Sequence, residues 1–173
     1  MTALVWTRGY GRAALERAQE LFGLTFPPDQ FKLLLDRRPV DGPDWRNEAE
    51  IRERLAWPYE GLLFDVEHNG LWWPEWGERP GTAEARAEAL RQVVAAAPRL
   101  IPVFGHRYLP ETPAAAGNPV FPVWQSDVIL YGADLEDWVA REDDGWDHRP
   151  WPPVREIPFW SELVRRNGLL PEG

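Results

Sequence analysis

Histidine and cysteine, which often bind metals or act in catalysis, are scarce in this chain. Three histidines occur, His68, His106 and His148, and cysteine is absent. No two histidines have the i, i+4 spacing that places two zinc ligands on one helix face. Without cysteine there is no thiolate ligand, disulfide or thiol nucleophile. The sequence also lacks a glycine-rich phosphate loop, a nucleophile elbow and a dinucleotide-binding fingerprint. We therefore predict no metal site, no cofactor and no catalytic residue.

Residues 105–110 are the closest to a catalytic segment. At a strand end, His106 would serve as a general base and Arg107 as an anion clamp, with Asp127 orienting the base. A structural role makes fewer assumptions. Either side chain would pair with Asp127 or Gln125 on a neighbouring strand and so satisfy the polar groups of a buried strand edge. We favour the structural role and keep catalysis as the alternative.

A second candidate site combines carboxylates with tryptophans. Two carboxylates at a suitable separation would form a glycosidase pair, and neighbouring indole rings would stack on a sugar. The same residues also fit a charged strand face beside core tryptophans. A carbohydrate-binding or hydrolytic enzyme that uses this segment, or His106 and Arg107, is the alternative function. The residues concerned are Asp65, Glu67, Glu75, Trp72, Trp73 and Trp76.

Residues 134–151 concentrate negative charge and aromatic rings. Between residues 134 and 147, seven carboxylates occur with Arg141 as the one arginine among them. Aromatic anchors inside an acidic rim are typical of a protein-binding patch, whereas a plain acidic run is typical of a solvated loop. Both interpretations stay open, and Asp147 belongs to the same run. The predicted partner-binding residues are Asp134, Glu136, Asp137, Trp138, Glu142, Asp143, Asp144, Trp146 and Trp151.

The overall charge limits the kind of partner. The net charge is −9, from 28 Asp and Glu against 19 Lys and Arg. Phosphate requires a positive field, so direct nucleic-acid binding is not expected and a protein with a basic surface fits better. No apolar run reaches the length of a membrane span, and residues 1–12 lack the apolar core of a secretory signal. We therefore expect a cytoplasmic protein without membrane association.

Helical periodicity and end signals predict the helices. Gly23 stops the first helix, and a proline pair opens the second. Asp44 is the N-cap of the third, which Trp57 and Pro58 end, and Thr82 caps the strongest helix. The predicted ranges are 12–22, the stretch from the proline pair to just before residue 39, 44–56, 82–97, a short helix after Asp134, and 159–166.

Alternating apolar residues predict strands near 62–67, 100–104, 120–124 and 127–131, with a broken return strand at 71–76. Helices first, strands in the middle and helices last indicate an α+β fold with a mostly antiparallel sheet flanked by helices. The length of 173 residues suits one domain.

Two stretches in the second half carry a recognisable pattern. Residues 100–110 read Leu-Ile-Pro-Val-Phe-Gly-His-Arg-Tyr-Leu-Pro, and residues 117–138 run from Gly-Asn-Pro-Val-Phe-Pro-Val-Trp to Leu-Glu-Asp-Trp. Together they resemble the C-terminal half of bacterial SUKH proteins of the Smi/Knr type. Residues 21–35 are similar to the start of that family, a helix, a proline pair and a second helix. The similarity lies within 12–140, and residues 1–11, the tract 41–57 and a C-terminal extension at 141–173 have no counterpart.

The resemblance implies a SUKH-like α+β domain without catalytic residues, whose bacterial members commonly neutralise toxins by binding them. We therefore predict a non-catalytic immunity protein, one domain over residues 1–173, that binds a cognate protein toxin with a basic surface. The oligomeric state stays open.

Overall fold

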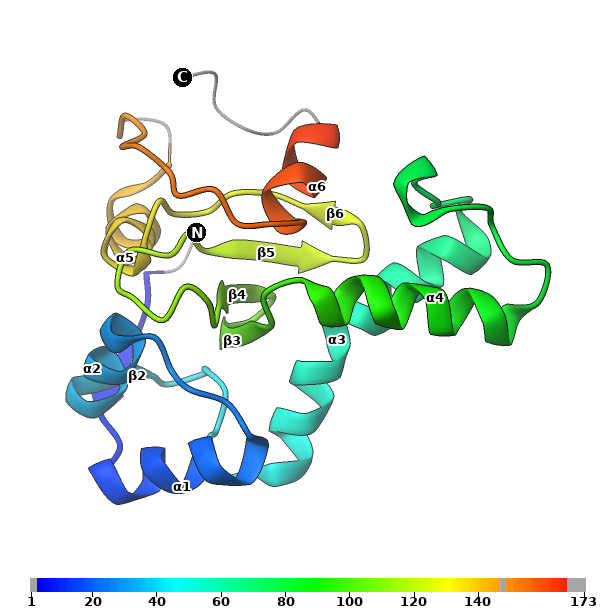
Figure 1. Ribbon diagram of the computed structural model, residues 1–173. Helices are drawn as coiled ribbons and strands as arrows, with labels where there is room; N and C mark the ends of the chain where they lie inside the picture. Colours follow the sequence, from blue (N-terminus) through cyan, green and yellow to red (C-terminus); the bar gives the residue numbers. More distant parts are fainter. Residues whose placement is uncertain (1–2, 147–148, 168–173) are drawn as a thin grey trace.

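A computed structural model describes residues 3–146 and 149–167, and it shows helices packed around a small antiparallel sheet (Figure 1). Strands β3, β4, β5 and β6 form one sheet in that order, and β1 pairs with β2 in a second sheet, every pair being antiparallel. The predicted α+β class with a mostly antiparallel sheet is therefore confirmed. The helices are α1 (Arg12–Phe22), α2 (Pro28–Asp36), α3 (Glu48–His68), α4 (Ala83–Ala96), α5 (Leu135–Asp144) and α6 (Trp160–Arg166), with a 3-10 turn, η1 (Pro74–Trp76). The strands are β1 (Trp6–Arg8), β2 (Arg37–Pro39), β3 (Leu100–Phe104), β4 (Arg107–Pro110), β5 (Phe121–Trp124) and β6 (Asp127–Val128).

Helices cover both faces of the four-stranded sheet. Successive strand residues point to opposite faces. Tyr108 and Phe121, which pair across β4 and β5, join the core made with α3, α4 and α6. Ile101 and Leu109, which pair across β3 and β4, point the other way, toward the clusters of α1, α2 and α5. No helix in the described ranges is long and apolar enough to cross a membrane.

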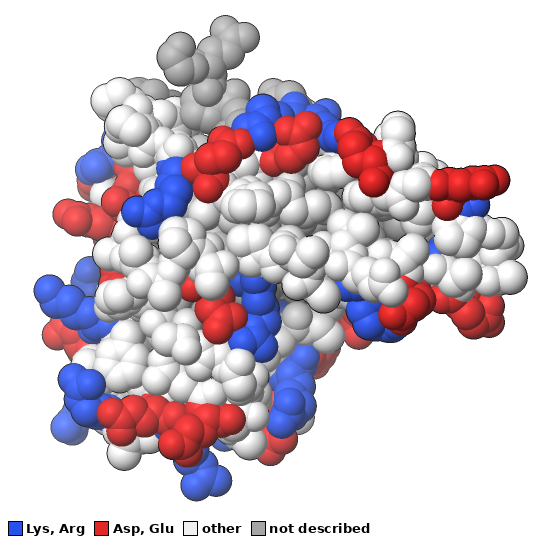
Figure 2. All heavy atoms as spheres, viewed as in Figure 1, with Lys and Arg blue, Asp and Glu red and all other residues white. Residues whose placement is uncertain are grey.

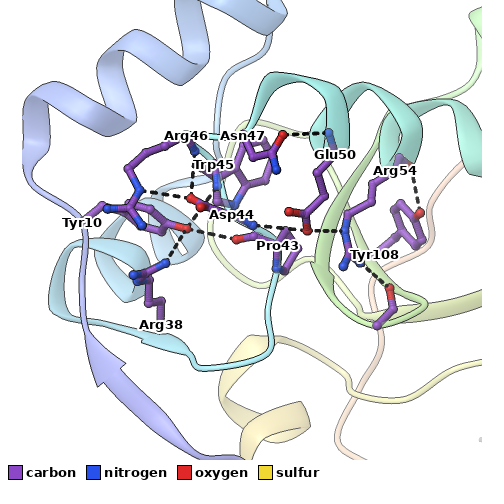
Figure 3. Close-up of polar contacts among 11 residues, drawn as sticks. Tyr10, Arg38, Pro43, Asp44, Trp45, Arg46, Asn47, Glu50, Arg54 and Tyr108 are labelled. Atoms are coloured by element: carbon purple, nitrogen blue, oxygen red, sulfur yellow. Dashed lines mark hydrogen bonds and ion pairs between the residues drawn. The ribbon is translucent and has the colours of Figure 1, made fainter.

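The strand predicted at 62–67 is wrong, because these residues belong to α3. The helix continues through Pro58, where a stop was predicted. Proline has no N–H to donate to the carbonyl four residues earlier, that of Arg54, and the hydroxyl of Tyr108 donates to this oxygen instead at 2.8 Å (Figure 3). With that carbonyl satisfied, Leu62 and Val66 follow at helical spacing and are fully buried.

The other assignments in this part of the chain also change. Asn47, not Asp44, is the N-cap of α3, and its side-chain oxygen accepts the Glu50 N–H at 3.2 Å. Residues 71–76 contain the turn η1 instead of a return strand. Strand β4 was not predicted, and β5 and β6 are shorter than the predicted strands, although Val120 bridges to Gly132 beyond them.

The tract 41–57, which has no counterpart in the predicted family resemblance, closes the core against α1 and α2. Tyr10 organises it: its hydroxyl donates to the Pro43 carbonyl at 3.0 Å and accepts the Trp45 N–H at 3.1 Å (Figure 3). The Trp45 ring then packs edge-on against Phe26, 4.7 Å between centroids. The start of α3 is thereby fixed to α1 and α2.

The described part of the C-terminal extension is integral to the fold. The Trp160 indole donates to the Pro98 carbonyl at 2.8 Å, and the Asn167 amide donates to the Ser126 carbonyl at 2.8 Å. Side chains of α6 are buried in the same core as the sheet. Helix α6 therefore covers the sheet near β6, as Figure 1 shows.

Candidate functional site

The residues of the catalytic alternative near His106 are held in structural contacts. The His106 ring stacks on Trp57 at 5.5 Å and meets Trp124 edge-on at 4.7 Å between centroids. Arg107 donates from Nε to Glu142 at 2.8 Å, so the predicted pairing with Asp127 or Gln125 is wrong. The pKa of His106 is lowered by burial first and then by the positive charges of Arg107 and Arg54. This arrangement ties the β3–β4 turn to α3 and α5.

The three carboxylates of the hydrolase alternative are also engaged. Asp65 accepts the Ser126 N–H at 2.8 Å and the Asn69 amide at 2.6 Å. Arg86 donates to the two carboxylate oxygens of Glu67 from Nε at 2.7 Å and from Nη2 at 2.8 Å. This hydrogen bonding lowers the pKa of Glu67. Glu75 pairs with Arg166 at 2.5 Å. Asp65 and Glu67 lie on helix α3, so the charged strand face expected as their structural role is wrong too.

The tryptophans of the same alternative cover one another. Trp73 stacks on Trp76 at 5.2 Å and contacts Phe159 at 5.3 Å, and the Arg166 guanidinium lies 3.8 Å from the centre of the Trp73 ring. Trp72 meets Trp76 edge-on. The rings form a packed cluster next to α6.

The predicted partner-binding residues form three groups by their exposure, and the first group is interior. Trp138 is fully buried, and Asp137 and Glu142 are 8% and 6% exposed. Asp137 pairs with Arg141 at 2.9 Å, and the Trp138 indole donates to Glu142 at 3.0 Å. These three side chains therefore offer little surface to a partner, although Asp137 lines a hollow with Asp144 and Trp151, and their contact with a partner stays a prediction. Trp138 and Glu142 face the sheet, where Glu142 pairs with Arg107 of β4, whereas Asp137 faces Arg141.

Three further predicted residues have structural contacts and are only partly accessible. Asp134 is the N-cap of α5 and accepts the Asp137 N–H at 2.8 Å. The centre of the Trp151 ring lies 3.7 Å from the guanidinium carbon of the buried Arg141. The Trp146 ring packs on the Tyr131 ring, with 4.2 Å between their centroids. All three are half-buried. Asp147 lies outside the described residues.

The third group faces solvent. Glu136, Asp143 and Asp144 are exposed on the outer side of α5. They border a groove of about 640 Å³ between α5 and α2, a neighbour that the sequence did not identify. The groove residues on α2 recur at helical spacing in the sequence. That spacing predicts that they share one face of α2, but it does not predict that α5 lies opposite this face. The acidic lining residues are Asp29, Asp36, Glu136, Asp143 and Asp144, the basic ones Lys32 and Arg37, and the apolar ones Leu33, Leu135, Val139 and Ala140.

The carboxylates of this groove have few basic partners. Among the residues that the structure describes, Asp36, Glu136 and Asp143 make no ion pair, and Asp144 pairs only with Arg149, at 3.4 Å. Around α6, by contrast, Arg165 and Arg166 pair with glutamates, and Figure 2 shows acidic and basic side chains side by side at the top of the molecule. With five carboxylates against two basic residues in its lining, the groove between α2 and α5 therefore carries a net negative charge.

Comparison with known proteins identified no relative of this chain. No family model matches the chain, and no curated protein or solved structure shows a significant match. The resemblance to SUKH proteins stays a prediction. In the described ranges, no three metal-ligating side chains lie close enough to hold an ion.

Proposed function

We propose that this chain is a non-catalytic immunity-type protein, which neutralises a cognate bacterial toxin in the cytoplasm by covering a basic surface of that toxin. The observation that carries the proposal is the acidic face shared by α2 and α5, where five carboxylates meet two basic residues. Such a face attracts and orients a cationic protein. The net charge of −9 and the similarity of residues 100–110 and 117–138 to SUKH proteins support the same function.

The contacts of the alternative sites favour binding over chemistry. A general base must reach a substrate proton, and a sugar platform must present an open ring face. His106 is exposed but its ring stacks on Trp57 and meets Trp124 edge-on, Glu67 is neutralised by Arg86, and the tryptophans near α6 pack on each other. The outer carboxylates of α5 are exposed and open to a partner.

The test begins by capturing partners with the tagged chain in its native host. A captured protein is then expressed alone and together with the chain. We expect it to arrest growth alone and to be neutralised on co-expression. A captured set without any such toxic protein would contradict the immunity role.

Surface plasmon resonance then locates the acidic surface. We expect Glu136→Gln/Asp143→Asn/Asp144→Asn to lower the association rate about tenfold and to flatten its dependence on salt, because steering is screened beyond about 8 Å at physiological ionic strength. The variant Glu16→Gln/Glu20→Gln/Glu53→Gln removes the same charge from exposed positions elsewhere. Equal association rates for the two variants would show that the acidic face of α5 contributes no more to association than other exposed carboxylates do.

A further inference from the structure

We infer that the groove between α2 and α5 is the docking site, and that its occupant is a basic amphipathic helix of the partner. This inference rests on the proposed function, because it names the part of the partner that the acidic face receives.

The shape of the groove follows from the two helices that line it. On α2 the lining residues Asp29, Leu33 and Asp36 recur at four and three positions, and on α5 the lining residues Leu135, Val139 and Asp143 recur at four positions. Each helix thus presents one face along its length. At 1.5 Å per residue, α2 and α5 are about 14 Å long, which matches about three turns of a bound helix.

The floor of the groove is apolar and rigid. Leu135 belongs to the core cluster around Trp138, and the half-buried Leu33 and Val139 pack against that cluster. These side chains are held in place before any partner arrives, which reduces the entropy cost of docking. Ala140 has the smallest side chain of the lining and leaves room above the floor. An apolar stripe with i, i+3, i+4 and i+7 spacing is the complement of such a floor.

The rim selects for positive charge. Asp29 is fixed by the Gly117 N–H at 3.0 Å and the Gln30 N–H at 3.0 Å. Of the two basic lining residues, Arg37 stacks its guanidinium on the Trp6 ring at 4.2 Å. Lysine or arginine on the flanks of a bound helix would meet carboxylates on both walls. A second copy of this chain, with a net charge of −9, would instead bring like charges together.

The test uses three labelled peptides of about 14 residues, a length near the minimum for helix formation in water. One has leucines at helical spacing and lysines elsewhere, the second replaces the lysines by glutamates, and the third replaces the leucines by serines. Binding to the full chain is followed by fluorescence anisotropy. We expect the Leu/Lys peptide to bind at least about tenfold more tightly than the Ser/Lys peptide, and the Leu/Glu peptide not to bind.

Variants of Ala140 locate the binding. Ala140→Trp fills the groove with a large side chain. Ala140→Lys adds a positive charge at the same position and is the second variant if the tryptophan impairs folding. We expect both to weaken Leu/Lys binding at least about tenfold, and Ala85→Trp, at an exposed position of α4, to leave it unchanged. Thermal unfolding checks that each variant is folded.

The outcomes separate this inference from the proposed function. Leu/Lys binding that is insensitive to both Ala140 variants, or no tighter than Ser/Lys binding, would overturn the groove as a helix site while leaving an acidic binding surface. Failure of both basic peptides to bind would contradict the inference and the proposed function together.

Discussion

Pro58 and Tyr108 act on one backbone carbonyl. Pro58, inside α3, has no N–H for the carbonyl of Arg54, and the Tyr108 hydroxyl of β4 donates to that oxygen at 2.8 Å (Figure 3). Burial raises the pKa of Tyr108 well above its usual value of about 10, so the hydroxyl keeps the proton that it donates. A residue of the sheet thus supports the helical turn that proline would otherwise break.

We expect Tyr108→Phe to lower the free energy of unfolding by about 1–2 kcal/mol, because the Arg54 carbonyl loses its donor. In a Pro58→Ala background the restored N–H of residue 58 can donate to that carbonyl, so the same substitution should cost less than half as much. Urea denaturation of the two single variants and the double variant gives the coupling. Equal costs in both backgrounds would show that the two residues are independent.

Arg141 should be essential for stability. Its side chain is fully buried, pairs with Asp137 and donates to the carbonyls of Arg149 and Pro150 at 3.1 Å each. Arg141→Ala leaves these acceptors unpaired, and we expect a loss of about 3–5 kcal/mol in the free energy of unfolding. Arg141→Lys should not restore it, because lysine lacks the planar fork. Arg91→Ala, at an exposed position, is the control, and similar losses for Arg141→Ala and Arg91→Ala would refute the prediction.

Gly61 should not tolerate alanine, although alanine usually stabilises a helix by about 1 kcal/mol over glycine. A Cβ at Gly61 would lie 2.9 Å from the Cα of Gln125, in the turn between β5 and β6. We therefore expect Gly61→Ala to destabilise the protein by about 1–3 kcal/mol. At Gly81 an added Cβ meets nothing within 4 Å, so Gly81→Ala should stay within about 0.5 kcal/mol of the wild type. A stabilised Gly61→Ala protein in denaturant titrations would mean that the turn does not rest on α3.

Acid should weaken the fold through His106. Its pKa is lowered in the folded state, so the unfolded chain binds the proton more readily, and stability that is complete above the ordinary value of 6.5 is lost as the pH falls below it. His106→Phe keeps an aromatic ring against Trp57 and Trp124 and removes the titration. We expect its melting temperature to fall less than that of the wild type between about pH 7.5 and pH 5. An NMR titration of the His106 imidazole with an apparent pKa at or above 6.5 would contradict this.

Local signals in the sequence predicted the parts of the fold whose causes lie within a few residues. Gly23 ends α1 in the left-handed region with a φ of 60°, and Thr82 caps α4 through the Ala85 N–H at 3.2 Å. Asp134 caps α5. A cap or a stop needs only its neighbours along the chain, so the sequence suffices for it.

Tertiary contacts decided what distant residues control. The predicted end of the helix at Pro58 was wrong because Tyr108, which donates to the Arg54 carbonyl, comes from another element. The acidic run is charged, as its composition shows, but the contact of Asp137 with Arg141 and that of Glu142 with Arg107 of β4 bury these two carboxylates, whereas Asp143 stays exposed. The acidic residues of α2 became part of the candidate site only through the approach of α5. Composition determines how much charge a segment carries, whereas burial and pairing depend on which surface folds against it, and only the three-dimensional structure contains that information.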